Sequence, residues 1–311
     1  MTASTPSQIA ESLGGDPGRR RREKQWRSLF LGAAATSIVI TVAIVLSLVG
    51  EAWVFIVNVE MGSLWEIGWF PRRGLFDLRT LIVGTLLVAG IAMAVATPLG
   101  LGAAMYLSEY ARPAVRKVMK PSLEILAGIP SVVLGYFALT FITPEILKAI
   151  FGNDVAGFNM LAAGIGVGIL TIPLVASIAE DAMRAVPLSL REASYGLGAS
   201  RMTTSVRIVF PAAISGIVAS LIIGFSRAIG ETMVVAIASG ATGGSLFTWN
   251  VLQPGQTMTA AMAALAIGSD RVRGADYAFQ SLFFVGLLLF LVTLALNVLS
   301  ERFVRRVRQR Y

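Results

Sequence analysis

The chain contains neither cysteine nor histidine among its 311 residues. These absences exclude disulfides, thiolate nucleophiles, zinc sites built from cysteine or histidine, and acid–base catalysis by histidine. Charge is also scarce, because only 14% of the residues are charged, whereas soluble domains carry about 25%. Since 55% of the residues are hydrophobic, the composition predicts a polytopic membrane protein and argues against an electron-transferring or zinc-dependent enzyme.

Six segments are long and apolar enough to cross a bilayer, which takes about 20 mostly apolar residues. We predict an all-α polytopic membrane protein with six transmembrane helices, at residues 28–50, 80–108, 121–143, 159–179, 208–239 and 279–300. The first segment follows the basic run "GRRRREKQW" and lacks a small-residue cleavage site, so we interpret it as a retained helix and not as a signal peptide. The predicted parts are a cytoplasmic basic tail (1–27), the first helix (28–50), an external loop (51–79), a five-helix core (80–300) and a second cytoplasmic basic tail (301–311).

Lysine and arginine are distributed unevenly between the two sides of this arrangement. One side holds 19 of the 26 basic residues, in the two tails and in the loops after the second and fourth segments. By the positive-inside rule both termini are predicted to be cytoplasmic, and the basic clusters are topology signals and not a nucleic-acid site. The other side holds Arg72, Arg73, Arg79, Lys148, Arg271 and Arg273. Those in the external segments 51–79 and 240–278 either attract an anion or its carrier, or are only solvated.

The polar loop from Glu180 to Gly216 lies between the fourth and fifth segments and is too patterned for a plain linker. Its composition predicts a short helix, a turn at Gly198, and a second helix that Pro211 leads into the membrane. Alternatively, it is an amphipathic loop that merely joins two spans. The chain has no G-x-x-x-x-G-K-[ST] motif and therefore does not cradle nucleotide phosphates in the Walker manner.

Within this loop, Glu192-Ala193-Ser194 precedes Gly198, and Ile208-Val209-Phe210-Pro211 follows. This order resembles the signature E-A-(A/S), three residues, G, nine residues, I-x-(L/F)-P of the inner-membrane permeases of ABC importers. Further stretches are similar to the phosphate-specific importer permeases: "PSLEILAGIPSVVLG", "TIPLVASIAEDAMRAVP" and "SRAIGETMVV". The "GETM" form and the "FVRRVRQRY" ending resemble the PstC type of permease more than the paralogous PstA type, and the similarity covers roughly residues 75–311.

The resemblance implies a type I ABC importer permease fold in the bacterial cytoplasmic (inner) membrane, working by alternating access. The implied partners are a paralogous permease of the PstA type, two copies of a nucleotide-binding ATPase subunit, an external phosphate-binding protein and membrane lipid, with no nucleic acid. The chain is then a transport subunit and not an enzyme, and it binds no cofactor, because ATP and Mg²⁺ are held by the ATPase subunit. A coupling loop at 180–210 docks on that subunit through residues that include Arg191, Glu192, Ala193, Ser194, Gly198, Ile208 and Pro211.

Two charges fall inside the fifth predicted helix, in "FSRAIGETMVV". Each costs several kcal/mol near the middle of a bilayer, and intramembrane charges are functional by default. Arg227 lies ~24 Å along the helix from Pro211, in the outer half of the membrane. Glu231 follows one turn later and is predicted on the same face as Arg227 and Gly224, on a small-residue strip that meets another helix or lines a pathway.

Two interpretations of this pair are open. In the first, Arg227 and Glu231 form a structural ion pair that fixes helix packing. In the second, which we favour, both line the substrate pathway with Ser226 and Gly224, and the guanidinium offers bidentate donors to phosphate. Glu231 then either neutralises Arg227 while the pathway is empty or accepts the proton of protonated phosphate, which discriminates against fully ionised sulfate.

Two prolines fall inside predicted helices, Pro130 in the third and Pro173 in the fourth. Each removes a backbone hydrogen bond and kinks its helix, either as a hinge or as a static feature. Glu124 is predicted near the cytoplasmic end of the third helix, where it either pairs with a loop arginine or takes part in transport.

Two functional alternatives stand beside phosphate import. One is the permease of an ABC importer for another oxyanion. The other is a stand-alone secondary transporter or channel that uses Arg227 and Glu231 as a substrate or proton relay site. The coupling-loop motif and the absence of an obvious inverted repeat argue against the second alternative. A membrane enzyme is disfavoured because the sequence contains no catalytic constellation.

Overall fold

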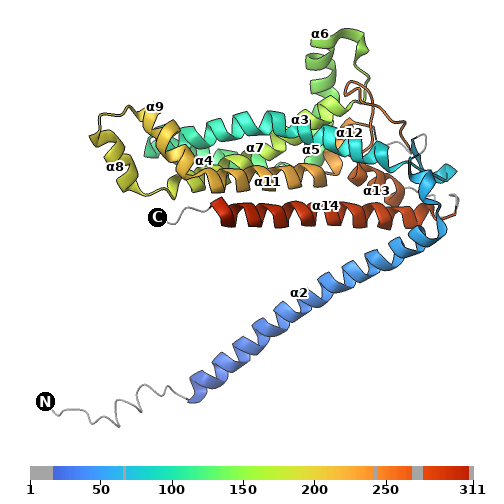
Figure 1. Ribbon diagram of the computed structural model, residues 1–311, viewed down its shortest axis with the longest axis horizontal. Helices are drawn as coiled ribbons and strands as arrows, with labels where there is room; N and C mark the ends of the chain where they lie inside the picture. The colour runs from blue at the N-terminus through green and yellow to red at the C-terminus, as the bar shows by residue number, and fades with distance from the viewer. Residues whose placement is uncertain (1–16, 66–67, 241–243, 268–275, 308–311) are drawn as a thin grey trace. The chain divides into compact units, whose positions relative to one another are not determined.

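The computed structural model describes residues 17–65, 68–240, 244–267 and 276–307, and these residues are almost entirely helical (Figure 1). The chain divides into two compact units, Met1–Gly50 and Glu51–Tyr311. Arg271, Arg273, Arg308 and Arg310, on which part of the predicted orientation depends, lie outside the described residues.

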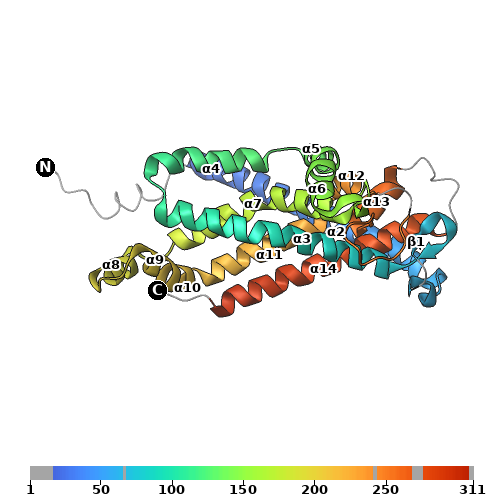
Figure 2. The ribbon, with the colours of Figure 1, turned by 90° about the horizontal axis from the view of Figure 1, so that it is seen from above.

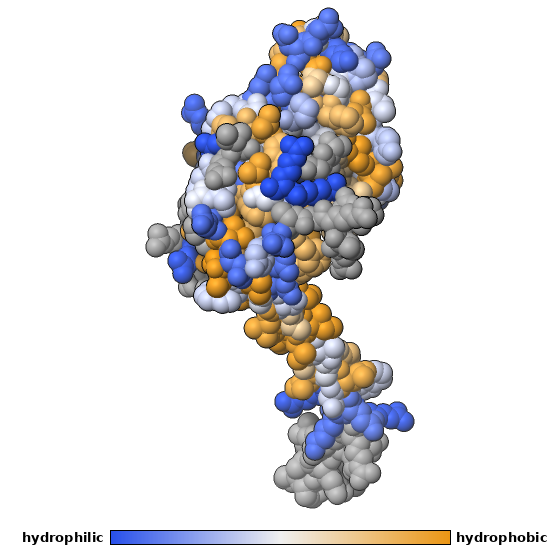
Figure 3. Space-filling view, turned by 90° about the vertical axis from the view of Figure 1, so that its right-hand side faces the viewer, coloured by the Kyte–Doolittle hydropathy of each residue, from blue (hydrophilic) through white to orange (hydrophobic). Residues whose placement is uncertain are grey.

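The first unit contains most of helix α2 (Pro17–Asn58). Its apolar side chains, such as Phe30, Ile38 and Leu46, are exposed along the helix. In Figure 3 the surface of this helix is mostly hydrophobic beyond a group of hydrophilic side chains at its N-terminal end. A helix that is apolar on all sides requires apolar surroundings, which a bilayer supplies.

Four long helices of the second unit lie side by side: α3 (Leu78–Met105), α7 (Met160–Arg184), α11 (Ile214–Gly230) and α14 (Ala278–Val307) (Figures 1 and 2). Glycines permit the close approach of α3 and α7. A Cβ atom on Gly168 would lie 2.9 Å from the Ala92 carbonyl oxygen, and one on Gly100 would lie 2.9 Å from Val175. Small residues at helix contacts are typical of membrane helix packing, where the attraction comes from close van der Waals contact.

The core between these helices is built mainly of Val, Leu, Ile and Ala side chains. Val88 and Ala92 of α3 form one buried cluster with Val167 and Leu170 of α7 and Ile229 of α11. A second cluster surrounds a small antiparallel hairpin, β1 (Trp69–Phe70) and β2 (Leu75–Phe76), in which Trp69 is buried. The other described elements are η1 (Met61–Trp65), η2 (Pro71–Arg73), η3 (Tyr106–Tyr110), α4 (Pro113–Ala127), α5 (Ser131–Phe137), η4 (Ala138–Leu147), α6 (Lys148–Phe151), η5 (Gly152–Asp154), α8 (Leu188–Gly196), α9 (Arg201–Thr204), η6 (Ser205–Val209), α10 (Phe210–Ala212), α12 (Met233–Ala238) and α13 (Met258–Ile267).

The third predicted helix, 121–143, is wrong as a continuous helix. Helix α4 ends at Ala127, and α5 begins at Ser131. Proline disfavours helical geometry at the residue before it, so the chain breaks there and Pro130 becomes the N-cap of α5 instead of a kink inside a helix. The apolar segment long enough to span is Ser131–Asp154, whereas Pro173 does lie inside α7 as predicted.

The fifth predicted helix, 208–239, is interrupted twice. The segments Arg201–Ala212 and Ile214–Gly230 meet at an angle of 71°, two residues after Pro211, which lacks the N–H group that a helix interior needs. The second break follows Gly230, where Glu231 is extended (φ −70°, ψ 128°). The Glu231 carbonyl then accepts a hydrogen bond from the Thr259 hydroxyl at 2.8 Å, which satisfies the interrupted backbone.

The described residues contain five helices long and apolar enough to cross a membrane. The bent pair made of Arg201–Ala212 and Ile214–Gly230 counts as a sixth if it forms one span. The fold is therefore that of a helical protein with five or six candidate spans.

Candidate functional site

A cavity of about 300 Å³ lies between η3, α4, α7 and α11. Its wall is mostly apolar and includes Pro173, but four charged side chains also line it: Lys120, Glu124, Glu180 and Arg227. A mostly apolar pocket with a few polar groups is the usual form of a small-ligand site, and this volume is at the small end of the range of roughly 300–1,000 Å³.

Arg227 reaches this cavity from the last turn of α11. Its side chain is exposed, and its guanidinium forms no hydrogen bond or ion pair with any residue that the structure describes. The helix C-terminus favours a positive charge at this position. The five N–H donors of the guanidinium are therefore free for an oxygen-rich ligand.

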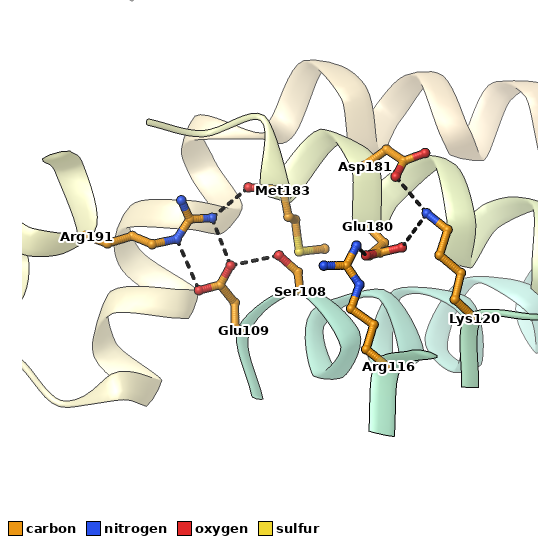
Figure 4. Close-up of polar contacts among 8 residues, drawn as sticks. All are labelled: Ser108, Glu109, Arg116, Lys120, Glu180, Asp181, Met183 and Arg191. Atoms are coloured by element: carbon orange, nitrogen blue, oxygen red, sulfur yellow. Dashed lines mark hydrogen bonds and ion pairs between the residues drawn. The ribbon is translucent and has the colours of Figure 1, made fainter. Parts of the chain in front are cut away.

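Lys120, the second cation of the cavity wall, is already compensated. Its Nζ atom lies 3.0 Å from Glu180 Oε2 and 3.0 Å from Asp181 Oδ1, both on α7 (Figure 4). The hydrogen bond to Asp181, together with the Glu180 carboxylate, raises the pKa of Lys120 above its ordinary value of 10.5. Lys120 is thus cationic at neutral pH, and its charge is matched within the chain.

Glu180 is fully buried and also accepts a hydrogen bond from Arg116 of α4 (Figure 4). We call the set Arg116, Lys120, Glu180 and Asp181 the α4–α7 clasp. Because the positive charges come from one helix and the negative charges from the other, the clasp attaches α4 to α7. A carboxylate that is removed from water requires such partners.

Gly224 and Ser226 do not occur among the described residues that line the cavity. A Cβ atom on Gly224 would lie 2.9 Å from Val175 and 3.2 Å from Thr171, so Gly224 permits close packing of α11 on α7. Ser226 is directed toward Asn297 of α14, with 3.5 Å between Oγ and Oδ1. Of the two alternatives for the small-residue strip, Gly224 therefore matches the helix contact.

Glu231 does not share a helix face with Arg227, contrary to the prediction. The four-residue spacing requires an unbroken helix, and α11 ends at Gly230. The Glu231 carboxylate accepts a long hydrogen bond (3.4 Å) from the Val234 backbone N–H at the start of α12. Within the described part of the chain, no ion pair joins it to Arg227. Glu231 is also not among the described residues of the cavity wall.

The loop after α7 has the predicted form of two short helices joined by a turn. Helix α8 ends at Gly196, and Gly198 takes the left-handed conformation (φ +79°) that glycine adopts without strain. Ser194 of α8 and Thr204 of α9 are 2.8 Å apart at their hydroxyl oxygens, which holds the two helices together. Glu192, Ala193 and Pro211 are exposed, and Ile208 is half-buried.

Arg191 is not a free charge on this loop. Its guanidinium binds Glu109 of η3, with 3.0 Å between Nη2 and Oε1, and donates to the Met183 carbonyl (Figure 4). It also donates to the Val186 carbonyl. These contacts fasten α8 to the ends of α3 and α7. The Arg191 guanidinium is thus bound within the chain, whereas the Glu192 side chain is exposed, and contact of either residue with the ATPase stays a prediction.

Four charged residues of the site were not singled out from the sequence: Glu109, Arg116, Lys120 and Glu180. The i, i+4 spacing of Arg116 and Lys120 was a usable signal, because it places both on one face of a helix. Their partner Glu180 is 64 residues further along the chain from Arg116, and no local pattern identifies it.

The comparisons with known proteins agree on the kind of protein. Residues 96–310 match the model of the family described as "Binding-protein-dependent transport system inner membrane component". The phosphate transport system permease protein PstC 1 of Mycobacterium tuberculosis (strain ATCC 25618 / H37Rv) is 35% identical over 254 residues, or 76% of this chain and 75% of the relative. The phosphate transport system permease protein PstC of Xylella fastidiosa (strain 9a5c) is 28% identical over 328 residues, which cover 100% of this chain and 99% of the relative.

Solved structures support the same fold. A chain of the bacterial ABC transporter involved in the import of the acidic polysaccharide alginate aligns with a TM-score of 0.63 at 15% identity, over 93% of this chain and 100% of that chain. A chain of the MetNI methionine ABC transporter in an inward-facing conformation aligns with a TM-score of 0.53 at 18% identity. The alignment covers 75% of this chain and 94% of that chain. The present chain belongs to the family of binding-protein-dependent transport system inner membrane components.

Proposed function

We propose that this chain is a permease subunit of an ATP-driven, binding-protein-dependent importer of inorganic phosphate. The observation that carries the proposal is the unpaired Arg227 guanidinium in a cavity bounded by α4, α7 and α11. Phosphate is one of the oxyanions that a planar, permanently charged group with bidentate donors binds well. The names of the relatives, phosphate transport system permease proteins, support the choice of phosphate over other oxyanions.

The proposed membrane arrangement has six spans and both termini in the cytoplasm, in a type I importer permease fold. Five helices and one bent pair supply the spans, and the excess of basic residues in the tails supports this orientation. We place the chain in the cytoplasmic (inner) membrane of a bacterium, as the organisms of the phosphate transport relatives support. PstC-type relatives favour the PstC role over the PstA role.

The proposed partners are a PstA-type permease, two copies of an ATPase subunit and an external phosphate-binding protein. The loop around α8 and α9 suits the ATPase, because its apolar side chains Leu188, Leu197 and Met202 are exposed, Leu197 to 90%. ATP and Mg²⁺ belong to the ATPase in this proposal, because the chain contains no Walker motif. One structural neighbour, a bacterial alginate ABC transporter, was solved in complex with an alginate-bound periplasmic protein. This neighbour supports the proposal of an external binding-protein partner.

In the proposed cycle the loaded binding protein docks outside, and closure of the ATPase pair moves the coupling loop. The loop is joined to the membrane helices through the Arg191–Glu109 pair and through α10, so its displacement is passed to α3, α7 and α11. The cavity, first open to the outside, then opens to the cytoplasm. During this change Arg227 holds phosphate by charge-assisted hydrogen bonds. Glu231 stays a predicted pathway residue with either of the two roles given above.

Reconstitution of the whole complex in proteoliposomes tests the proposal. We expect phosphate, delivered by its binding protein, to stimulate ATP hydrolysis and to accumulate inside, whereas sulfate and molybdate do neither. Arg227→Gln is expected to lower phosphate uptake by at least tenfold, which corresponds to about 1.4 kcal/mol of lost stabilisation. Arg27→Gln, which changes an exposed arginine of α2, is the matched control. Normal uptake by an assembled Arg227→Gln complex would contradict the proposal, and uptake without the ATPase subunit would favour a secondary transporter.

A further inference from the structure

We propose that Glu124 is the residue that selects a protonated oxyanion in the cavity, by accepting a hydrogen bond from the P–OH group of phosphate. The inference deepens the proposed function and rests on it. Of the two roles left open for Glu231, the role of proton acceptor is then taken by Glu124 on a different element, and Glu231 keeps the role of neutralising Arg227 while the pathway is empty.

Glu124 lies on the cavity wall with Arg227. Its carboxylate forms no hydrogen bond or ion pair with any described residue, so the expected pairing with a loop arginine does not occur. Lys120, by contrast, is bound by Glu180 and Asp181. After these internal pairs are made, the wall retains Arg227 as a cation and Glu124 as a carboxylate that no described residue compensates.

The α4–α7 clasp orients Glu124. Arg116, Lys120 and Glu124 follow one another at i, i+4 and i+8 on α4, which places them in one row on the same helix face. The first two bind Glu180 of α7, so the row is directed toward α7 and Glu124 continues it along the cavity. Glu124 therefore reaches the cavity from a helix that is fixed in place, not from a mobile loop.

A free cation and a free carboxylate in one cavity are complementary to phosphate in particular. An ionised carboxylate only accepts hydrogen bonds, whereas a guanidinium only donates them. Dihydrogen and monohydrogen phosphate each keep a P–OH donor for the carboxylate and offer bare oxygens to the guanidinium. Sulfate at neutral pH is fully ionised and has no donor, so next to Glu124 it meets like-charge repulsion and leaves an acceptor without a partner.

Discrimination of this kind is usually large. A site that is built to bond a hydroxyl rejects an analogue without it by as much as about 10⁴–10⁵ when the site is closed to water. Glu124 is exposed in the isolated chain, so we expect a smaller effect, on the order of tenfold or more.

Competition binding on the complete transporter in lipid nanodiscs, without the external binding protein, tests the inference. Radiolabelled inorganic phosphate is the probe, and unlabelled sulfate or arsenate is the competitor. For the unmodified complex we expect arsenate, which also carries a hydroxyl, to displace phosphate and sulfate to fail. For Glu124→Gln, whose amide both donates and accepts, we expect the sulfate concentration for half displacement to fall by about tenfold or more.

Glu145→Gln is the matched control, because Glu145 is an exposed glutamate that is not among the described residues of the cavity wall. It should retain the exclusion of sulfate. Glu124 has no side-chain partner to lose, so its substitution leaves the described contacts intact. This inference would be overturned if Glu124→Gln excluded sulfate as well as the unmodified complex does. If Arg227→Gln lost phosphate binding at the same time, the proposed function would still stand. Full phosphate binding in Arg227→Gln would overturn the proposed function and the inference with it.

Discussion

Arg227 and Lys120 both bring a positive charge to the cavity, but their surroundings give them different tasks. Lys120 is neutralised by the carboxylates of Glu180 and Asp181, and its contribution is to hold α4 on α7. Arg227 has no such partner among the described residues and lines the cavity as an open donor. The difference supports Arg227 as the proposed ligand-binding arginine through the pairing of charges, and not through its position in an apolar segment alone.

Arg191 illustrates what the sequence could not predict at this scale. The motif around Glu192 indicated a helix near the membrane surface, and it drew attention to both charges. The partner of Arg191 is Glu109, 82 residues away in η3, and only the folded chain brings them together. The sequence placed Arg191 in the coupling loop, but it did not predict that this half-buried side chain joins α8 to η3.

Substitution of Arg191 should consequently weaken folding. Arg191→Met leaves the Glu109 carboxylate, whose side chain is only 4% exposed, without its cation. We expect the free energy of unfolding to fall by about 3–5 kcal/mol, because an unpaired buried charge is costly. Thermal unfolding of the detergent-solubilised complex measures the effect. The double variant Arg191→Met with Glu109→Gln should regain part of the loss, and Glu192→Ala, at an exposed site, should cost almost nothing. A single Arg191→Met variant as stable as the unmodified protein would refute this role.

At the scale of helices, hydropathy located the apolar segments but not their breaks. Segment composition indicates where a span can lie. Helices α2 and α14 contain the apolar segments predicted for them, α3 together with η3 covers the second segment, and α7 covers the fourth from Met160 onward. The breaks depend on partners that a local pattern does not contain. Glu231 can leave the helix because Thr259, 28 residues further on, bonds its carbonyl. The turn at Gly198, by contrast, was predictable because glycine itself encodes it.

Gly198 and Gly196 form a matched pair for testing that turn. A Cβ atom on either would meet nothing within 4 Å, but only Gly198 has a positive φ, +79°. Gly198→Ala should therefore cost about 1–2 kcal/mol through backbone strain alone, whereas Gly196→Ala should not be destabilising. We expect Gly198→Ala to reduce phosphate-stimulated ATP hydrolysis by the assembled complex, since the strain alters the angle between α8 and α9. Equal activity of the two variants would show that the turn geometry is unimportant for coupling.

At the scale of the molecule, we propose that the chain supplies one side of a transport route. Its cavity wall comes from α4, α7 and α11, with α4 fastened to α7 by the clasp. Helix α7 leads into the loop that contains α8 and α9, and α11 follows this loop, so the proposed ligand-binding residues and the proposed docking surface share one framework. Six apolar segments and the loop motif allowed the family to be predicted from the sequence. The cavity could not be predicted, because its wall combines residues that lie more than 100 positions apart, Lys120 and Arg227.

The central claim is that phosphate occupies the cavity beside Arg227. The chain has no cysteine, so Ser177→Cys, on the cavity wall, introduces its sole thiol. Labelling of this thiol by a small water-soluble reagent is followed in the assembled complex during ATP-driven transport. We predict that phosphate with its binding protein slows the labelling several-fold and that sulfate does not, while Asn153→Cys, at an exposed site outside the cavity wall, labels equally in both. Labelling of Ser177→Cys that is the same with and without phosphate would contradict the account.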